Sequence, residues 1–312
     1  MSKFALMVYD TSLFGTWDSV VNKSKNGNFL HLRNYMDYHA HRFDERSVIV
    51  EKNAKPVAIF PCNRLGNQVV SHGGLTYGGL IYGNDLHTIE ILEIFGMLMQ
   101  HYKQMGASTL VYKAIPHIFH RYPAEEDLYA LFRSGAQLVR RDISSVIPLK
   151  EKLKYSDSRK NTIRKAEKQR VVVQEGDFLT EYHALLSSVL EKFESQPVHS
   201  LLELQLLKNR FPENIRVFCA FKDERLLGGA IMYDFGHVAH TQYLATSEEG
   251  KEIGALDYTL AYLLDGPFSS HKYFSFGIST EKNGMHLNEG LIFQKEGFGG
   301  RGVVHDFYEM RL

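Results

Sequence analysis

The chain has 312 residues, of which 44% are hydrophobic and 12% aromatic, enough for two cores of ordinary size. This composition excludes a disordered chain and a single small module. The 36 Lys and Arg residues balance 36 Asp and Glu residues, and a formal net charge of zero offers no global field that favours nucleic acid or a membrane surface.

The cysteine content and the N-terminal sequence indicate the cellular compartment of the protein. Cys62 and Cys219 are far apart in strand-like runs, which is typical of reduced core thiols and not of a disulfide framework or a metal site. The first ten residues lack the pattern of a signal peptide, and no apolar run is long enough for a membrane span. We therefore expect a cytoplasmic protein without membrane insertion.

The first half of the chain alternates between helix-like and strand-like patterns. The predicted elements are helices around 17–21 and 35–43, strands 47–51, 56–62 and 67–71, a helix from about 85 to 104 capped by Asp85, a strand 108–113, a helix 123–134 and a strand 137–149. A glycine-rich segment at 72–79 separates the third strand from the long helix.

The second half repeats this order of elements after a basic stretch, 150–170, that holds nine Lys or Arg and three acidic residues. The predicted elements are helices 156–169 and 178–193, a helix that begins at the capping box Ser200–Glu203, strands 171–174, 215–221, 226–233 and 237–245, a glycine-bearing loop 247–254 that opens a helix to Leu264, a strand 273–277, a short helix 283–290 and a strand 303–311. We interpret the agreement as a tandem duplication of one α/β unit, with domains at 1–150 and 151–312.

The strand-to-helix loop at 247–254 is the sharpest local feature. Unpaired backbone N–H groups at a helix N-terminus suit a pyrophosphate, and Lys251 would add a mobile positive charge. A plain tight turn is the alternative interpretation. The spacing matches neither a Walker loop nor a dinucleotide fingerprint, which counts against nucleotide triphosphate hydrolysis and hydride transfer. The cofactor-binding candidates are Leu244, Ala245, Thr246, Gly250, Lys251, Glu252, Ile253, Gly254 and Ala255.

Three segments together carry a family resemblance. The meander, the loop and a strand ending in Phe276-Gly277 resemble the acyl-CoA-binding core of the GNAT acyltransferases, and 158–168 resembles the Arg-rich helix of FemABX-type tandem GNAT proteins. The ending 288–300 is similar to their Asn-x-Gly-Leu and Lys-x-Gly-Phe-Gly-Gly pattern. The resemblance implies an α/β (α+β) fold of two tandem GNAT-like domains, with mixed, mostly antiparallel sheets flanked by helices.

Within that family, segments 75–80 and 115–123 are more similar to the branch that uses acyl-CoA. The resemblance implies that coenzyme A carries the acyl group and that the acceptor is the amine of a nucleotide-linked sugar, a dTDP-linked 3-amino-3,6-dideoxyhexose for O-antigen or capsule. Two alternatives stay open. One is an aminoacyl-tRNA-dependent enzyme of peptidoglycan synthesis, against which the zero net charge and the lack of an inserted helical arm count. The other is a catalytically silent binding module.

The GNAT pattern also implies which residues act in catalysis. Oxyanion donors would come from the backbone around Tyr243, at the splayed end of the fourth strand. Lys295 would stabilise the oxyanion or the leaving group, and Glu289 would accept the amine proton, with Asn288 in the same motif. Family members often place an aromatic residue before this lysine, whereas this chain has Gln294.

Substrate-binding candidates fall into three groups, each with a structural alternative. His72, Thr76 and Tyr77 lie in the glycine-rich segment and could contact the sugar, or merely anchor a loop. The phosphate candidates on the basic helix are Arg159, Lys160 and Arg164, although a charge run is usually a solvated face. His240 and Gln242 share one face of the fourth strand, where a buried core histidine is the commoner case. The fifteen histidines form no metal spacing, and we expect no metal and no nucleic-acid partner.

Overall fold

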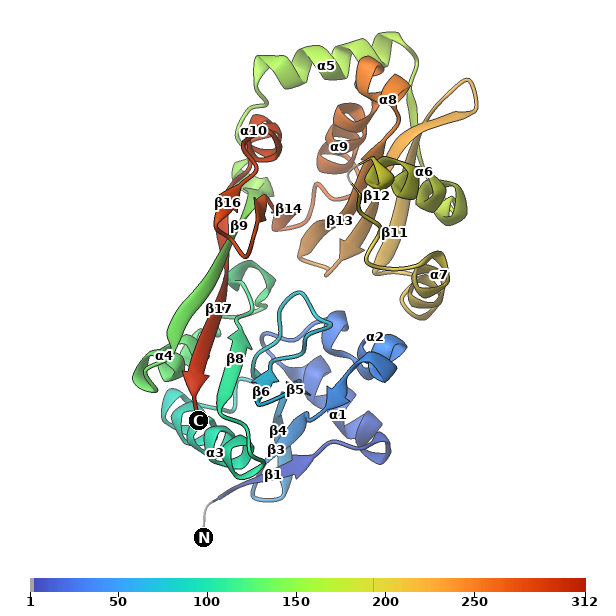
Figure 1. The fold of residues 1–312 in the computed structure, drawn as a ribbon. Helices are drawn as coiled ribbons and strands as arrows, with labels where there is room; N and C mark the ends of the chain where they lie inside the picture. Colours follow the sequence, from blue (N-terminus) through green and yellow to red (C-terminus); the bar gives the residue numbers. More distant parts are fainter. Residues whose placement is uncertain (1–2, 193) are drawn as a thin grey trace. The chain divides into compact units, whose positions relative to one another are not determined.

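In a computed structural model that describes residues 3–192 and 194–312, the chain divides into two compact units (Figure 1). Unit 1 consists of Met1–Asp142, Lys282–Met285 and Val304–Leu312, and unit 2 of Ile143–Glu281 and His286–Val303. This division differs from a single boundary at residue 150 because the C-terminal stretch returns to unit 1, where it pairs with a strand of the first half.

Unit 1 contains two groups of strands. An antiparallel sheet has the order β1-β3-β4-β7 and comprises β1 (Phe4–Val8), β3 (Val48–Lys52), β4 (Lys55–Phe60) and β7 (Ile81–Tyr82). The other group has the order β17-β8-β6-β5-β2 and comprises β17 (Arg301–Arg311, of which 304–311 belong to this unit), β8 (Thr109–Lys113), β6 (Gln68–Val70), β5 (Asn63–Leu65) and β2 (Asp44–Glu45). Among these pairs, β6 and β8 run parallel and the others antiparallel.

The helices of unit 1 match the apolar periodicity, but two predictions about them were wrong in detail. They are α1 (Phe14–Lys23), α2 (Arg33–Met36), α3 (Thr88–Gln104) and α4 (Glu126–Arg133), with 3-10 segments at Thr11–Leu13, Phe29–His31, Asp37–Arg42 and His117–Phe119. His87 and Glu90 form the capping box of α3, so Asp85 is not its cap. The predicted helix 35–43 is not continuous: α2 ends at Met36, and the 3-10 segment that follows is kinked at His39, which has non-helical dihedral angles.

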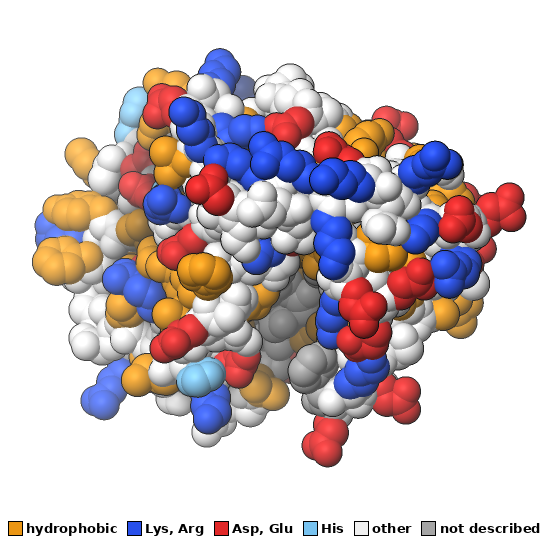
Figure 2. Space-filling model, turned by 90° about the horizontal axis from the view of Figure 1, so that it is seen from above, with side chains coloured by type: hydrophobic (Ala, Val, Ile, Leu, Met, Phe, Trp, Pro, Cys, Tyr) orange, Lys and Arg blue, Asp and Glu red, His pale blue; other side chains and the backbone are white. Residues whose placement is uncertain are grey.

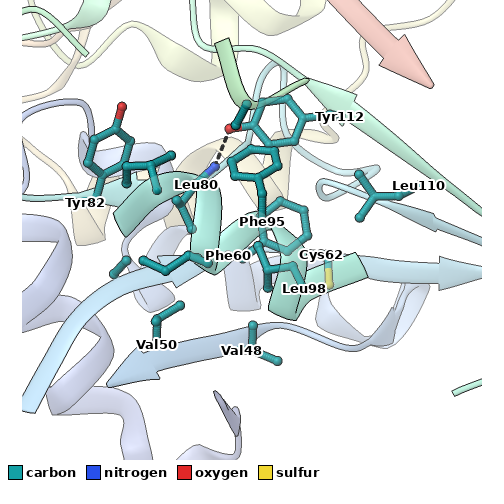
Figure 3. Packing of buried hydrophobic residues seen from close by; sticks show 14 of the residues in the cluster. Val48, Val50, Phe60, Cys62, Leu80, Tyr82, Phe95, Leu98, Leu110 and Tyr112 are labelled. Atoms are coloured by element: carbon teal, nitrogen blue, oxygen red, sulfur yellow. Dashed lines mark hydrogen bonds between the residues drawn. The ribbon is translucent and has the colours of Figure 1, made fainter. Parts of the chain in front are cut away.

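The core of unit 1 gathers side chains from β3, β4, α3 and β8 (Figure 3). Phe60 and Tyr112 stack with ring centroids 6.0 Å apart. The hydroxyl of Tyr112 accepts the N–H of Leu80 at 2.7 Å and donates to Asp127 at 2.6 Å. Both hydrogen bonds matter because a buried hydroxyl without partners would destabilise the core.

Unit 2 has one sheet with the order β10-β11-β12-β13-β14-β9. Its strands are β10 (Val172–Glu175), β11 (Ile215–Lys222), β12 (Arg225–Asp234), β13 (Val238–Thr246), β14 (Tyr273–Ile278) and the second part of β9 (Gln137–Pro148). The pair β13–β14 is parallel and the others are antiparallel. A hairpin of β15 (Thr280–Glu281) and β16 (His286–Leu287) follows β14.

The helices of unit 2 are α5 (Asp157–Lys168), α6 (Leu179–Glu191), α7 (Leu201–Arg210), α8 (Glu248–Ile253), α9 (Ala255–Asp265) and α10 (Glu289–Gly297), with a 3-10 segment at Leu149–Glu151. Ala230 of β12 packs in one core with α9, whereas a Cβ on the adjacent Gly229 would lie 3.2 Å from Tyr182 of α6. Successive residues of a strand point to opposite faces, so α6 and α9 cover opposite faces of the sheet.

Two predicted elements of unit 2 were wrong. The expected loop 247–254 contains the helix α8, because Ser247 caps its first turn and Gly254 ends it with φ +90°. The expected helix 283–290 is replaced by β16, and the helix α10 begins at Glu289. The predicted position of residue 193 at the end of α6 lies outside the described residues.

Each unit links its parallel strand pair through a long helix, α3 between β6 and β8 and α9 between β13 and β14. A parallel connection requires such a crossover, whereas the neighbouring antiparallel strands need only short turns. The predicted class, mixed and mostly antiparallel sheets flanked by helices, is confirmed.

Candidate active site

The strands β13 and β14 run side by side for three residue pairs and then separate. The last pair is His240–Ser275, although β13 continues to Thr246 and β14 to Ile278. A bulge in β13 leaves Gln242 without a partner residue in β12, which increases the local twist. Beyond His240 the backbone of β13 has no register partner on the side of β14. Backbone N–H groups at such an opening can stabilise a developing oxyanion.

The hydroxyl of Tyr243, directly after the bulge, contacts His199. Its Oη lies 2.7 Å from Nδ1 of His199 and accepts the backbone N–H of the same residue at 3.3 Å. His199 is buried, and burial raises the pKa of Tyr243, so the phenol keeps its proton at neutral pH. Sequence reasoning named Tyr243 but missed His199, whose only signal was its place before the Ser200 cap.

His240 lies at the point where the two strands separate. Its Nδ1 is 3.0 Å from the hydroxyl of Ser275, which is fully buried. A Cβ on Gly277, which has φ +71°, would lie 3.3 Å from Cε1 of His240, so the imidazole and this turn of β14 pack closely. The half-buried His240 is therefore held against β14, and its neighbour Gln242 lies in the bulge.

Lys295 of α10 is almost fully buried and directs its ammonium at the end of β14. Its Nζ donates to the carbonyls of Gly277 and Ile278 at 2.9 and 2.7 Å and to the hydroxyl of Ser279 at 2.9 Å. Burial lowers the pKa of Lys295 to about 8. Because all three donors are engaged, Lys295 stabilises the shape of this strand end through backbone contacts.

The other two residues of the predicted catalytic ending have different surroundings. Asn288 is the N-cap of α10, where its Oδ1 accepts the N–H of Leu291 at 3.0 Å and its Nδ2 donates to Glu281 at 2.9 Å. Glu289 lies exposed in the first turn of α10. Its carboxylate is free of hydrogen bonds to the described residues and is open to solvent.

The predicted cofactor-binding residues lie in the last part of β13, in α8 and at the start of α9. Ser247 accepts the N–H of Gly250 at 3.0 Å, and a Cβ on Gly250 would lie 2.3 Å from the carbonyl of Leu227. The glycine thus permits close packing on β12. The side chains of Leu244, Ala245, Thr246, Ile253 and Ala255 are buried or half-buried, and those of Lys251 and Glu252 are exposed.

The first turn of α8 carries the carboxylates Glu248 and Glu249, which pair with Lys192, Lys251 and Arg225. Gly254 contacts α5 so closely that a Cβ there would lie 2.5 Å from Cγ2 of Thr162. The serine cap thus engages one N–H of this turn, and the ion pairs offset the charge of its two carboxylates.

The phosphate candidates of α5 differ from one another in their surroundings. Arg159 donates to Asp257 of α9 at 2.6 Å, and both side chains are largely buried. Burial raises the pKa of Asp257, while Arg159 and Gln294 oppose that shift. Lys160 pairs with Asp157 at 3.0 Å. Arg164 is exposed and has no ion-pair partner among the described residues.

His72, Thr76 and Tyr77 lie in unit 1, in the loop after β6. His72 is buried with φ +52°, and burial with nearby positive charges lowers its pKa to about 3. The buried Tyr77 accepts a hydrogen bond from Asn28 at 3.1 Å, and Thr76 is exposed.

Sequence reasoning also missed Lys113, which holds the loop of His72 in place. Its buried Nζ donates to the carbonyls of His72, at 3.1 Å, and Leu75. Burial lowers the pKa of Lys113 to about 7.

Two further features bear on membranes and metals. Within residues 3–192 and 194–312, no helix combines the length and apolar character that a membrane crossing requires. Over the same residues, no three His, Cys, Asp or Glu side chains are grouped as metal ligands.

No protein-family model matches this sequence, and no curated protein matches it. Solved structures are similar to it across almost its full length. FemX has a TM-score of 0.68 at 11% identity, with 99% of this chain and 97% of that chain covered. L-PGS from Bacillus licheniformis has a TM-score of 0.65 at 13% identity, covering 97% and 92%. A tandem GNAT protein from the clavulanic acid biosynthesis pathway has a TM-score of 0.51 at 11% identity, covering 99% and 98%.

Identities this low show the fold alone. The predicted FemABX-like tandem GNAT fold is thus confirmed at the level of architecture: the chain has the fold of FemX and of tandem GNAT proteins.

Proposed function

We propose that the chain is an N-acyltransferase that forms an amide bond where β13 and β14 separate. The observation that carries the proposal is the protonated Tyr243, with its hydroxyl against His199, beside a stretch of β13 backbone that lacks a β14 partner. A proton donor and backbone N–H groups at one strand opening meet the two needs of acyl transfer, which are a protonated leaving group and a stabilised oxyanion.

In this mechanism a neutral amine attacks the acyl carbonyl. The carbon–nitrogen bond forms, and the bond from the carbonyl carbon to the sulfur or oxygen of the leaving group breaks. Tyr243 donates its proton to that atom, His199 passes a proton from solvent back to Tyr243, and the proton that the amine loses goes to Glu289 or to water. A sugar amine has a lower pKa than lysine, so a strong base is unnecessary.

In its first specific form, the donor is acyl-CoA and the acceptor is a nucleotide-linked amino sugar, a dTDP-linked 3-amino-3,6-dideoxyhexose for surface polysaccharide. This form is supported by the sequence similarity of segments 75–80 and 115–123 to that branch. The exposed Glu289 offers an acceptor for the amine proton, and Arg164 offers a charge for a phosphate.

A second candidate uses an aminoacyl group from charged tRNA as the donor. It is favoured by the capped turn of α8, where Ser247 already accepts the N–H of Gly250 that the diphosphate of coenzyme A would otherwise bind. It is also favoured by exposed cations on α5 such as Arg164, Lys165 and Lys168, which suit a phosphate backbone.

Turnover with defined donors tests the proposal. The purified chain is incubated with acetyl- or hydroxyacyl-CoA and dTDP-amino sugars, and thiol release is followed. A parallel reaction supplies charged tRNA with amine acceptors, and amide formation is measured by mass spectrometry. Amide formation in either reaction supports acyl transfer and identifies the donor. No amide in both, with no thermal shift from coenzyme A, would leave only a catalytically silent binding module.

A further inference from the structure

A groove of about 370 Å³ runs between α5 and α9 on the outside of unit 2. On α5 its wall is formed by Lys160, Arg164 and Glu167, which follow one another at helical spacing and therefore share one face. On the inner side the two helices are held together by the contact of Thr162 with Gly254 and by the ion pair from Arg159. These two contacts, and not the side chains that line the groove, set the distance between α5 and α9.

The wall on α5 carries two cations, Lys160 and Arg164, and one carboxylate, Glu167, while the carboxylate on the α9 side, Asp265, is paired with Lys152. Arg164 has no ion-pair partner in the described part of the chain, and Lys160 pairs only with Asp157, whose side chain is 94% exposed. An exposed pair of this kind contributes little and gives way to a better anion. Figure 2, which views this end of the molecule, shows a continuous row of Lys and Arg side chains. The groove therefore presents cations to anions from solvent.

The wall on α9 supplies aromatic rings. Tyr258 and Tyr262 are one helical turn apart and both line the groove, with the small Ala261 between them. Tyr262 is 41% exposed, so part of its ring is accessible to a ligand. Their hydroxyls make no hydrogen bonds to the described residues. Exposed rings next to cations are the arrangement on which proteins stack nucleobases while holding the phosphate.

We propose that this groove binds a nucleotide. Its base stacks on Tyr262 and Tyr258, its phosphate is bound by Arg164 and Lys160, and Glu167 at one end of the groove accepts hydrogen bonds from sugar hydroxyls. A volume of about 370 Å³ suits a single nucleotide. The ligand can be a free nucleotide or one unit of an RNA strand, since both present the same base and phosphate. The inference extends the proposed function, which also assigns a phosphate to Arg164, but AMP binding requires no turnover, so it can fail separately from acyl transfer.

Calorimetry on the full chain tests this inference with four probes, which are AMP, adenosine, inorganic phosphate and a single-stranded hexaadenylate. We expect AMP to bind at least about tenfold more tightly than adenosine or phosphate, because only AMP uses both walls. Arg164→Gln and Tyr262→Ala should each weaken AMP binding about tenfold, and Tyr262→Phe should retain it. Lys103→Gln, which removes an exposed lysine of α3 in unit 1, is the matched control and should change AMP binding less than about twofold.

The hexaadenylate distinguishes the two sources of the nucleotide. Binding tighter than AMP with a steep salt dependence identifies an RNA strand, and binding equal to AMP identifies a free nucleotide; both outcomes support the groove. Three outcomes would overturn the inference. They are no binding of AMP, equal affinity for AMP and inorganic phosphate, and a loss with Lys103→Gln as large as the loss with Arg164→Gln.

Discussion

Buried lysines without a carboxylate partner are the clearest feature at the scale of single residues. Lys113 and Lys295 are each less than a tenth exposed, and their hydrogen bonds go to backbone carbonyls and to one hydroxyl. Buried ammonium groups are rare unless they are paired, because a low-dielectric environment disfavours the charge. Each lysine instead shapes a backbone segment, the loop of His72 in unit 1 and the end of β14 in unit 2.

Lys113 therefore makes stability depend on pH. Its pKa is about 7 in the folded chain and 10.5 as an ordinary lysine, so between these values the unfolded chain binds a proton that the folded chain does not. Stability must rise as pH increases through this window. We expect the free energy of unfolding of the wild type, relative to Lys113→Met, to increase by up to about 1.4 kcal/mol per pH unit from pH 7.5 upward.

Urea unfolding at pH 7, 8 and 9 measures this difference. The control is Lys165→Met, an exposed lysine of α5, for which the difference from the wild type should stay constant with pH. A constant difference for Lys113→Met as well would contradict the role of its burial.

Tyr243 is the residue on which the proposed chemistry depends. Tyr243→Phe removes the proton donor and should lower kcat by about 100-fold, while the loss of one hydrogen bond lowers the free energy of unfolding by only about 1 kcal/mol. His199→Gln should lower kcat less and shift its pH dependence, because the relay loses its imidazole. Steady-state kinetics check both variants. Tyr273→Phe on β14 is the control, and an equal loss there would argue against a specific role of Tyr243.

At the scale of elements, α8 shows that glycines which predict a phosphate-binding loop can instead permit close packing. The segment 247–254 combines a serine, charged residues and two glycines, a pattern that predicts a phosphate-binding loop. In the structure, Gly250 lies inside the helix because its missing Cβ permits contact with β12. Gly254 ends the helix in a left-handed conformation and permits contact with α5.

Gly254→Ala should therefore destabilise unit 2. The substitution places a Cβ at φ +90° and 2.5 Å from Thr162, and we expect a loss of about 2 kcal/mol or more in the free energy of unfolding. Gly96→Ala, in the interior of α3 with no atom within 4 Å of its Cβ position, is the control and should gain about 0.5 to 1 kcal/mol. Denaturant unfolding followed by circular dichroism measures both. A neutral Gly254→Ala would mean that α5 can move away from α9.

At the scale of the whole molecule, each unit has its own hydrophobic core. The core of unit 1 includes Met310 from the C-terminal strand, and the core of unit 2 is built around β11, β12 and α9. The last residues of the chain thus complete the unit that the first residues begin. The formal charge of zero is likewise a sum over the molecule, since the exposed cations of α5 are concentrated on one helix.

Met310→Asp tests the separation of the two cores. A carboxylate buried in unit 1 should weaken hydrogen-exchange protection in β8 and α3 by at least about tenfold, because burying an unpaired charge costs several kcal/mol. Protection in β11 and β12 should remain within about twofold, since their core lacks Met310. Arg311→Asp at the adjacent exposed position is the control and should leave both unchanged. A matching loss in β11 and β12 would show one cooperative core.

Much of the fold follows from patterns within a few residues. The apolar stripe of α6, the capping box of Ser200 and Glu203 and the hairpins of β11 to β13 depend on neighbours in the chain, and all were predicted. The strand β1 was missed, because its pairing with β3 depends on residues far along the chain. The same holds for the candidate site, where Tyr243 was predicted and its partner His199 was missed.

The sequence by itself determined the tandem order of α/β elements, since periodicity and element order are local properties, and its resemblance to GNAT proteins implied a splayed end of the fourth strand. The tertiary structure alone decided which side chains are engaged. Arg159 pairs with Asp257, Lys295 with carbonyls of β14, and Tyr243 with His199, each across many residues of sequence. The sequence shows which side chains are charged. Whether such a side chain can bind a ligand depends on the groups that the fold brings within hydrogen-bond distance, and a local sequence pattern cannot predict those groups.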